Sequence, residues 1–160
     1  MAKLSDLGLA HQIFMRAYPY RHVDWRPGAI MQKPLAEARI ALITTAGFFT
    51  PDQTPFDASI RGGDPSFRVI PSVTEVSTLR ISHRSDAFDI RGIESDKNLA
   101  LPFDRFRSLV DQGVVGSMAP RHFSFMGSIT APGHLIATTA PQVERMLLED
   151  GVDAVLLTPV

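Results

Sequence analysis

Residues 139–160, TAPQVERMLLEDGVDAVLLTPV, contain the pattern that decides the fold: a helix, a glycine and a short apolar strand. Pro141 suits the first turn of a helix, and three apolar residues at helical spacing share one face: Val143, Met146 and Leu147. Gly151 ends this helix, which is expected over residues 142–150. Residues 152–157 then form a short, mostly apolar run of the kind that is typical of a strand buried in a parallel sheet. This order of elements predicts a βαβ unit.

Further helices and strands are expected upstream, and they alternate through the second half of the chain. Helices are expected at residues 7–17 and 103–112, with a helical turn at 35–39. Strands are expected at residues 40–45, 68–70, 79–83 and 114–119, with a short extended piece at 135–136. Residues 121–127 are polar and aromatic and are expected to form a loop, whereas residues 84–98 receive no assignment. The alternation predicts an α/β fold with an open, mostly parallel sheet and flanking helices, as in the N-terminal half of a Rossmann-like or flavodoxin-like domain.

The chain is expected to have two parts. Residues 1–34 form a helix and an aromatic-rich arm containing Tyr18, Tyr20 and Trp25. Residues 35–160 form the α/β domain. The 160 residues are 44% hydrophobic and 21% charged, which is ordinary for a globular domain that buries its core without disulfides.

Charge and cysteine content exclude several classes of function. The formal net charge of −1 gives no electrostatic basis for binding nucleic acid or an anionic membrane. No apolar run approaches membrane-spanning length and no signal-peptide layout is present, so a cytoplasmic location is expected. The absence of cysteine excludes disulfides, thiol nucleophiles and thiolate metal sites within these 160 residues.

Polar residues follow the expected strands and suggest a site at one edge of the sheet. They form three clusters, with Thr158 joining from the last strand: Thr44-Thr45, Ser82-His83, and Arg121-His122 with Ser124. If the strands are parallel neighbours, these clusters meet beyond their carboxyl ends. Arginine can hold a carboxylate through two hydrogen bonds and histidine can move protons, so a small anionic substrate is expected.

Structural roles remain open for the same residues. Asp64 before Pro65 is typical of a turn cap, and Arg68 can pair with it. A histidine after a strand is more often a structural residue than a catalyst. His83 and Asp86 have metal-ligand spacing, to which His122 would add a third ligand, but no supporting residues can be named and no metal is predicted. Motifs for nucleotide binding and serine hydrolysis are absent.

Several segments in fixed order resemble one known family. They are ALITTAG (41–47), PFD (55–57), GDPSFRVIP (63–71), LRISH (79–83), DKN (96–98) with Pro102, GSMAPRHFSFMG (116–127) and GVDAVLLTPV (151–160). Residues 41–160 are similar to the selenoprotein B subunits of the glycine/betaine/sarcosine/D-proline reductase family. The stretch after Ser82-His83 departs most from the family pattern.

The resemblance implies a redox residue directly after Val160. In the family, a selenocysteine or cysteine follows this strand end, with proline and another cysteine close behind. Selenocysteine uses a codon otherwise read as stop, so a translation would end after Val160, and the α/β domain is expected to be truncated here. His83 and His122 are then expected to support the redox residue. The expected substrate-binding residues are Thr44, Thr45, Asp64, Arg68, Ser82, Arg121, Ser124 and Thr158.

The implied activity is reductive cleavage of a C–N bond in a glycine, betaine, sarcosine or D-proline type substrate. A dithiol or thioredoxin-like protein would supply electrons, and other reductase subunits would be partners, one of them carrying a pyruvoyl group. No cofactor is expected within the 160 residues. Two alternatives stay open: a non-catalytic binding or assembly subunit that lacks the redox residue, and a generic α/β domain that binds a small carboxylate. Without a helix after the last strand, one face of the sheet would stay apolar and exposed, so an oligomer is expected.

Overall fold

The computed structural model describes residues 8–18, 28–85 and 89–160, and the chain divides into two units, residues 1–30 and 31–160. In the first unit, the predicted N-terminal helix is confirmed as α1 (Leu9–Ala17). The ring of Phe14 packs against Tyr18 with centroids 5.7 Å apart, while three apolar side chains of α1 are largely exposed: Leu9, Ile13 and Phe14. The rest of the aromatic arm, residues 19–27, lies outside the described residues.

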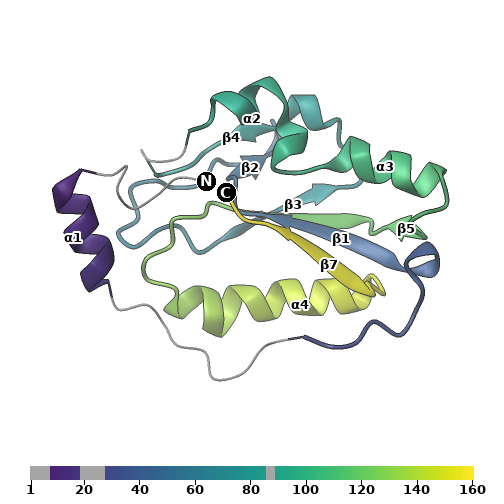
Figure 1. Ribbon diagram of the computed structural model, residues 1–160. Helices are drawn as coiled ribbons and strands as arrows, with labels where there is room; N and C mark the ends of the chain where they lie inside the picture. Colours follow the sequence, from purple (N-terminus) through teal and green to yellow (C-terminus); the bar gives the residue numbers. More distant parts are fainter. Residues whose placement is uncertain (1–7, 19–27, 86–88) are drawn as a thin grey trace. The chain divides into compact units, whose positions relative to one another are not determined.

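The second unit is built on a five-stranded sheet around β1 (Arg39–Thr44) (Figure 1). Three strands run parallel to β1: β5 (Ser117–Met118), β6 (Arg121–Phe125) and β7 (Ala154–Thr158). β3 (Phe67–Pro71) lies antiparallel on the far side of β6. The predicted α/β fold with an open, mostly parallel sheet is confirmed.

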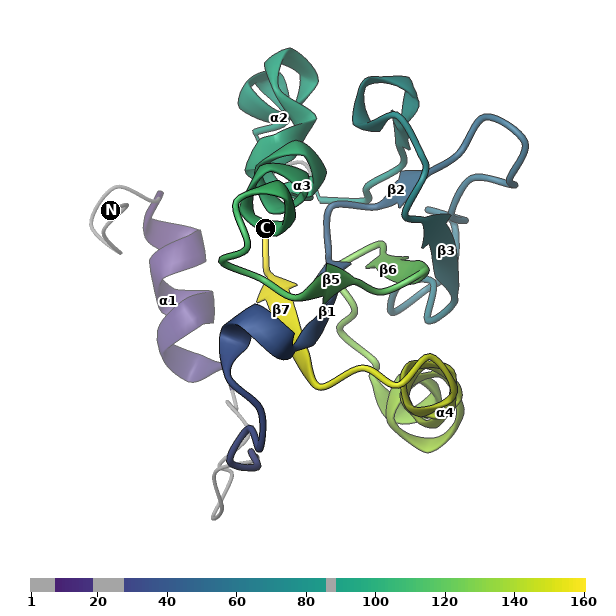
Figure 2. The same ribbon diagram turned by 90° about the vertical axis from the view of Figure 1, so that its right-hand side faces the viewer.

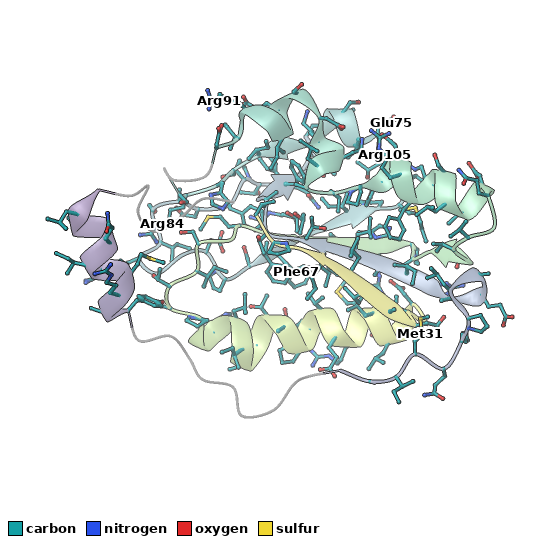
Figure 3. The ribbon with its side chains drawn as sticks, viewed as in Figure 1. Met31, Phe67, Glu75, Arg84, Arg91 and Arg105 are labelled. Carbon is teal, nitrogen blue, oxygen red and sulfur yellow. The ribbon has the colours of Figure 1, made fainter. Side chains whose placement is uncertain are left out.

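Helices cover both faces of this sheet. α2 (Arg91–Ser95) and α3 (Phe103–Asp111) lie on one face and α4 (Ala140–Glu149) lies on the other (Figure 2). The main core fills the space under α2 and α3, with inward residues from alternate positions of the strands: Ile40, Leu42 and Ile70. On the α4 side, Phe67, which is labelled in Figure 3, packs edge-on against Phe123 with ring centroids 5.7 Å apart.

A separate two-stranded sheet lies beside the main sheet. β2 (Phe48–Phe49) pairs antiparallel with β4 (Arg80–Ile81). Gly47, between β1 and β2, has φ of 70°, and a Cβ there would overlap the carbonyl of Ser82. The close approach of two backbones therefore requires glycine at this turn. The predicted strand at residues 79–83 is thus present but belongs to this small sheet and is not a parallel neighbour of β1.

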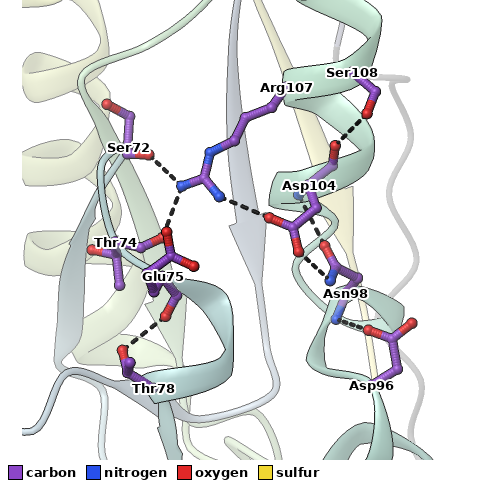
Figure 4. A network of polar contacts seen from close by, with 9 residues as sticks. All are labelled: Ser72, Thr74, Glu75, Thr78, Asp96, Asn98, Asp104, Arg107 and Ser108. Carbon is purple, nitrogen blue, oxygen red and sulfur yellow. Dashed lines mark hydrogen bonds and ion pairs between the residues drawn. The ribbon is translucent and has the colours of Figure 1, made fainter.

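A polar network fastens α3 to the connection between β3 and β4 (Figure 4). Arg107 donates to Asp104 Oδ1 and to the carbonyls of Ser72 and Thr74, each at 2.8 Å. Asn98 donates to Asp104 Oδ2 at 2.8 Å and accepts from the Asp104 backbone at 2.9 Å. The DKN segment of the family resemblance therefore has a structural role at the start of α3.

Two of the remaining elements differ from the sequence-based expectations. Residues 121–127, expected as a loop, contain strand β6, and the extended piece expected at 135–136 lies in a π-helical turn, Leu135–Thr139, that leads into α4. The unassigned stretch contains α2 and a 3-10 turn, Lys97–Leu99. Two further 3-10 turns are Leu35–Glu37, where a helical turn was expected, and Val76–Thr78. In the part of the chain that the structure describes, no helix is both long and apolar enough to cross a membrane.

Candidate functional site

A row of hydroxyl groups crosses the sheet at the carboxyl ends of its parallel strands. The register pairs Thr44 of β1 with Ser124 of β6 on one side and with Thr158 of β7 on the other. Thr44 is fully buried, and its Oγ1 donates to the carbonyl of Thr158 at 3.3 Å. The hydroxyls of Ser124 and Thr158 are also buried but have no hydrogen-bond partner among the described residues. The row therefore offers two buried donors at the predicted edge.

Thr45 connects the ends of β1 and β7. Its backbone N–H donates to the carbonyl of Thr158 at 3.3 Å. Its hydroxyl accepts from the Val160 N–H at 3.0 Å and donates to the Val160 carbonyl at 3.2 Å. The backbone of Val160 is thus held at both polar groups by one side chain.

The small sheet brings Ser82 and His83 to the same edge. The Ser82 N–H donates to the carbonyl of Gly47 at 2.9 Å, and its hydroxyl donates to the carbonyl of Phe56 at 3.0 Å. His83 Nδ1 accepts from the Ser85 N–H at 3.0 Å, which assigns the ring proton to Nε2. Burial lowers the pKa of His83 and so favours the neutral ring.

Gly127, just after β6, brings His83 and Thr45 close together. A Cβ at Gly127 would lie 2.6 Å from the Thr45 carbonyl and 2.8 Å from His83 Nε2. The N–H of His83 therefore lies at the strand end beside Thr45. A neutral N–H donor and two buried hydroxyls are groups that can stabilise an anionic sulfur or selenium atom. The residues at this edge fit the redox side chain that the sequence implies, although that side chain is outside the 160 residues.

Two hollows adjoin this edge. A polar pocket of about 650 Å³ is lined by Ser82, His83 and Ser85 together with the charged residues Arg80, Glu94 and Lys97. An apolar groove of about 790 Å³ lies between β7 and α4 and is lined by Thr45, Gly127, Val143, Leu147 and Leu157. Arg80 and Lys97 were not among the expected site residues. Arg80 could have been found from its place two residues before Ser82, whereas Lys97 lies in the stretch that received no assignment.

Asp64 and Arg68 lie near the same edge but organise the long loop. Asp64 accepts from the backbone of Asp57 and from the backbone and hydroxyl of Ser66, at 2.9, 2.9 and 2.6 Å. Burial would raise the pKa of Asp64, but these hydrogen bonds outweigh it and hold the pKa below its usual value. The interpretation of Asp64 as a turn cap is confirmed.

Arg68 lies opposite Ser124 in the register of β3 and β6. Its guanidinium donates to three carbonyls, those of Thr54, Pro55 and Phe67, and to the hydroxyl of Ser66. It also stacks on Phe56, with its central carbon 4.2 Å from the ring centroid. Its link to Asp64 therefore runs through Ser66, and its donors are largely occupied by the loop.

Arg121 is not at this edge, because residues 121–125 form a strand and Arg121 begins it. Its guanidinium donates two hydrogen bonds of 2.8 Å to the carboxylate of Asp150 and one of 3.0 Å to the carbonyl of Met146. The hydrogen bonds to Asp150, with a further one to Glu149, raise the pKa of Arg121. The expectation that Arg121 joins the other polar clusters is wrong, since β6 carries it to the opposite end of the sheet.

His122 is buried in the core on the α3 side of the sheet. Its Nδ1 accepts from the Leu42 N–H at 2.9 Å, and its ring packs against Phe103 with centroids 4.6 Å apart. Burial lowers the pKa of His122 to about 4, so the ring is neutral at pH 7. The expected position of His122 in a loop after a strand is therefore wrong. Among the described residues, no group of three histidine or acidic side chains could hold a metal, and Asp86 lies outside them.

Comparisons with known proteins agree with the resemblance seen in the sequence. The chain is 34% identical to the D-proline reductase subunit gamma of Acetoanaerobium sticklandii over 159 residues, which are 97% of this chain and 62% of that protein. It is 27% identical to the sarcosine reductase complex component B subunit beta of Peptoclostridium acidaminophilum, over 91% of this chain and 33% of that protein. The betaine reductase complex component B subunit beta of the same organism is 26% identical over 79% of this chain and 29% of its own length. The chain thus spans less than two thirds of the curated relatives it matches.

The family comparison covers nearly the whole chain. No solved structure matches the chain. The model of the family described as glycine/sarcosine/betaine reductase selenoprotein B matches residues 7–160. The chain therefore belongs to the glycine/sarcosine/betaine reductase selenoprotein B family.

Proposed function

We propose that this chain is part of a subunit of an amino-acid reductase complex, and that a selenocysteine or cysteine follows Val160. The proposal rests on the arrangement of side chains at the carboxyl ends of the parallel strands. There Thr45 holds the Val160 backbone, His83 supplies an N–H, and Ser124 and Thr158 supply buried hydroxyls. The relatives named as D-proline, sarcosine and betaine reductase subunits support the class of reaction.

The proposed reaction is the reductive cleavage of a C–N bond in a glycine, betaine, sarcosine or D-proline type substrate. Two electrons and two protons from a dithiol replace the C–N bond by a C–H and an N–H bond, and the dithiol becomes a disulfide. A selenolate or thiolate supplies the nucleophile for such chemistry. The 160 residues contain no cysteine, so a redox residue of this activity must lie outside them.

The polar pocket beside His83 is the proposed place for the substrate. Arg80 and Lys97 give it two cations for a carboxylate, and Glu94 gives it an anion for an ammonium group. Of the expected substrate contacts, Ser82 lines this pocket. Thr44, Ser124 and Thr158 remain proposed contacts at the adjoining edge of the sheet. Arg68 and Asp64 support the loop beside it and are proposed to act on substrate binding only through that loop.

The partners are proposed to be the other subunits of the complex, one of them with a pyruvoyl group, and a dithiol or thioredoxin-like electron donor. An assembly role without catalysis is the second candidate, since α1 exposes the apolar side chains of Leu9, Ile13 and Phe14. Both candidates predict a stable complex with other subunits. Only the first predicts turnover.

The test uses the chain extended from the gene through the residue after Val160, expressed with its partner subunits. With cysteine or selenocysteine in that place, we expect dithiol-dependent reduction of at least one of the four substrate types. The matched control carries serine in the same place and should be inactive. A complex that assembles but consumes none of the substrates would contradict the catalytic proposal and favour the assembly role.

A further inference from the structure

The last two residues of the chain leave the ladder of the sheet at a defined point. Strand β7 ends at Thr158, and Pro159 has no N–H with which to continue the hydrogen bonds to β1. On the neighbouring strand, β1 ends at Thr44, and the chain turns away through Gly47. Backbone pairing therefore stops on both strands before Val160 is reached.

A side chain takes over where the backbone pairing stops. The Thr45 hydroxyl is both acceptor and donor, and it uses both functions on Val160, at 3.0 Å to the N–H and 3.2 Å to the carbonyl. The Thr45 N–H adds a bond to the Thr158 carbonyl at 3.3 Å. Three hydrogen bonds from one residue thus fix the direction in which the chain leaves the sheet.

Thr45 lies next to His83 and beside the apolar groove, so the direction of the chain after Val160 decides which of these groups the next residue meets. Gly127 allows the Thr45 carbonyl and His83 Nε2 to approach each other, since a Cβ at Gly127 would lie within 3 Å of both atoms. The Thr45 side chain also borders the apolar groove, while His83 borders the polar pocket. The residue that anchors the Val160 backbone therefore borders the groove and lies next to the histidine that borders the pocket.

We propose that Thr45 is the positioning residue for the redox side chain. Its hydroxyl holds the backbone of Val160 by two hydrogen bonds and thereby places the residue that follows at the same edge of the sheet as His83. This inference rests on the proposed function, because it requires a redox residue after Val160. It assigns Thr45 a role distinct from the substrate contact expected from the sequence. Loss of the hydroxyl should release the strand end and leave the reactive side chain without a fixed neighbour.

The test measures the reactivity of a thiol, which does not require turnover. The chain extended through a cysteine after Val160 is alkylated with iodoacetamide between pH 5 and 10, in the assembled complex. Thr45→Val, which keeps the shape and removes the hydroxyl, should move the alkylation profile to higher pH by about one unit, because the apparent pKa of the thiol rises. Thr45→Ser, which keeps the hydroxyl, should react like the parent protein.

The matched control is Thr138→Val, since Thr138 is exposed in the turn before α4 and should leave the reactivity unchanged. A second measurement needs no reactive residue: the Val160 N–H should exchange with solvent slowly in the parent and in Thr45→Ser. Equal alkylation profiles for the parent and a folded Thr45→Val protein would overturn the inference. If Thr45→Val does not fold, fast exchange of the Val160 N–H in the parent would overturn it instead.

Failure of this inference can be told from failure of the proposed function. Absence of turnover together with Thr45-dependent alkylation contradicts the reductase and leaves the positioning role intact. Turnover together with alkylation that does not depend on Thr45 contradicts the positioning role and leaves the reductase intact.

Discussion

Gly127 is a residue on which the geometry of the edge depends. Its φ of 70° is unfavourable for other residues, and a Cβ would lie 2.6 Å from the Thr45 carbonyl. We predict that Gly127→Ala lowers the free energy of unfolding by about 2 kcal/mol or more, because backbone strain and a backbone contact add. Urea denaturation followed by circular dichroism measures this change.

The matched control is Gly133→Ala. Gly133 lies at the start of the helical segment before α4, and a Cβ there meets nothing within 4 Å. The free energy of unfolding of the Gly133→Ala protein should stay the same or rise slightly, since alanine has a higher helix propensity than glycine. Equal stability of Gly127→Ala and the parent protein would show that Thr45 and His83 are not held as closely as described.

His122 should make stability depend on pH. Burial holds its pKa at about 4 in the folded protein, against about 6.5 when the chain is unfolded. Between pH 6.5 and 4 the imidazole of His122 is protonated in the unfolded chain and neutral in the folded protein. The free energy of unfolding therefore rises with pH between these two values. We predict a loss of up to about 3 kcal/mol from this residue as the pH falls from 6.5 to 4.

The comparison variant for this prediction is His122→Asn, whose amide oxygen can still accept from the Leu42 N–H without titrating. The variant should be less stable at pH 7 because the ring no longer packs on Phe103. Its stability should nevertheless fall less steeply than that of the parent between pH 6.5 and 4. The same slope in both proteins would show that His122 is not buried in the neutral form.

Most residues of the edge could be predicted from the sequence, because each follows an apolar strand pattern. Thr44, Ser82, His83 and Thr158 were expected there, and the structure brings them together. The role of Thr45 in holding Val160 could not be predicted, since it depends on two strands that are 115 residues apart. The roles of these edge residues in binding or catalysis stay predictions.

Strand β6 is the element that sequence reasoning missed. From His122 to Phe125 polar and apolar residues alternate, which was a signal for a strand, but the polar residues His122 and Ser124 are buried. In the sequence alone, a histidine and a serine at these positions suggest an exposed loop, although both side chains are buried. The π-helical turn Leu135–Thr139 was missed for another reason: its β-branched residues favour strands, and the start of α4 overrides that preference.

The start of β6 is fastened to the end of α4 by Arg121. We predict that Arg121→Met lowers the free energy of unfolding by about 2 kcal/mol, because a forked pair with the nearly buried Asp150 is lost. The control Arg145→Met lies on an exposed position of the same helix and should change stability little. Urea denaturation compares both variants with the parent.

The same variant also tests the corrected position of Arg121. Because Arg121 lies at the opposite end of the sheet, Arg121→Met should not change the alkylation profile of the extended protein. A large change in that profile with little change in stability would contradict this position and restore the role expected from the sequence.

At the scale of the second unit, the sheet has helices on both faces but leaves one strand poorly covered. Val155, Leu156 and Leu157 of β7 remain substantially exposed, and Leu157 borders the apolar groove beside α4. Apolar surface of this kind favours association with another segment or subunit. The expected oligomer remains a prediction, as does the further resemblance to a Rossmann-like or flavodoxin-like domain.

We propose above that the anchored strand end presents a redox residue directly after Val160. The most direct measurement is mass spectrometry of the native protein, isolated from its source, with attention to the peptide that crosses Val160. We expect a polypeptide that continues beyond Val160, with the selenium isotope pattern or a cysteine in the next position. A native polypeptide that ends at Val160, or continues with neither residue in that position, would contradict it.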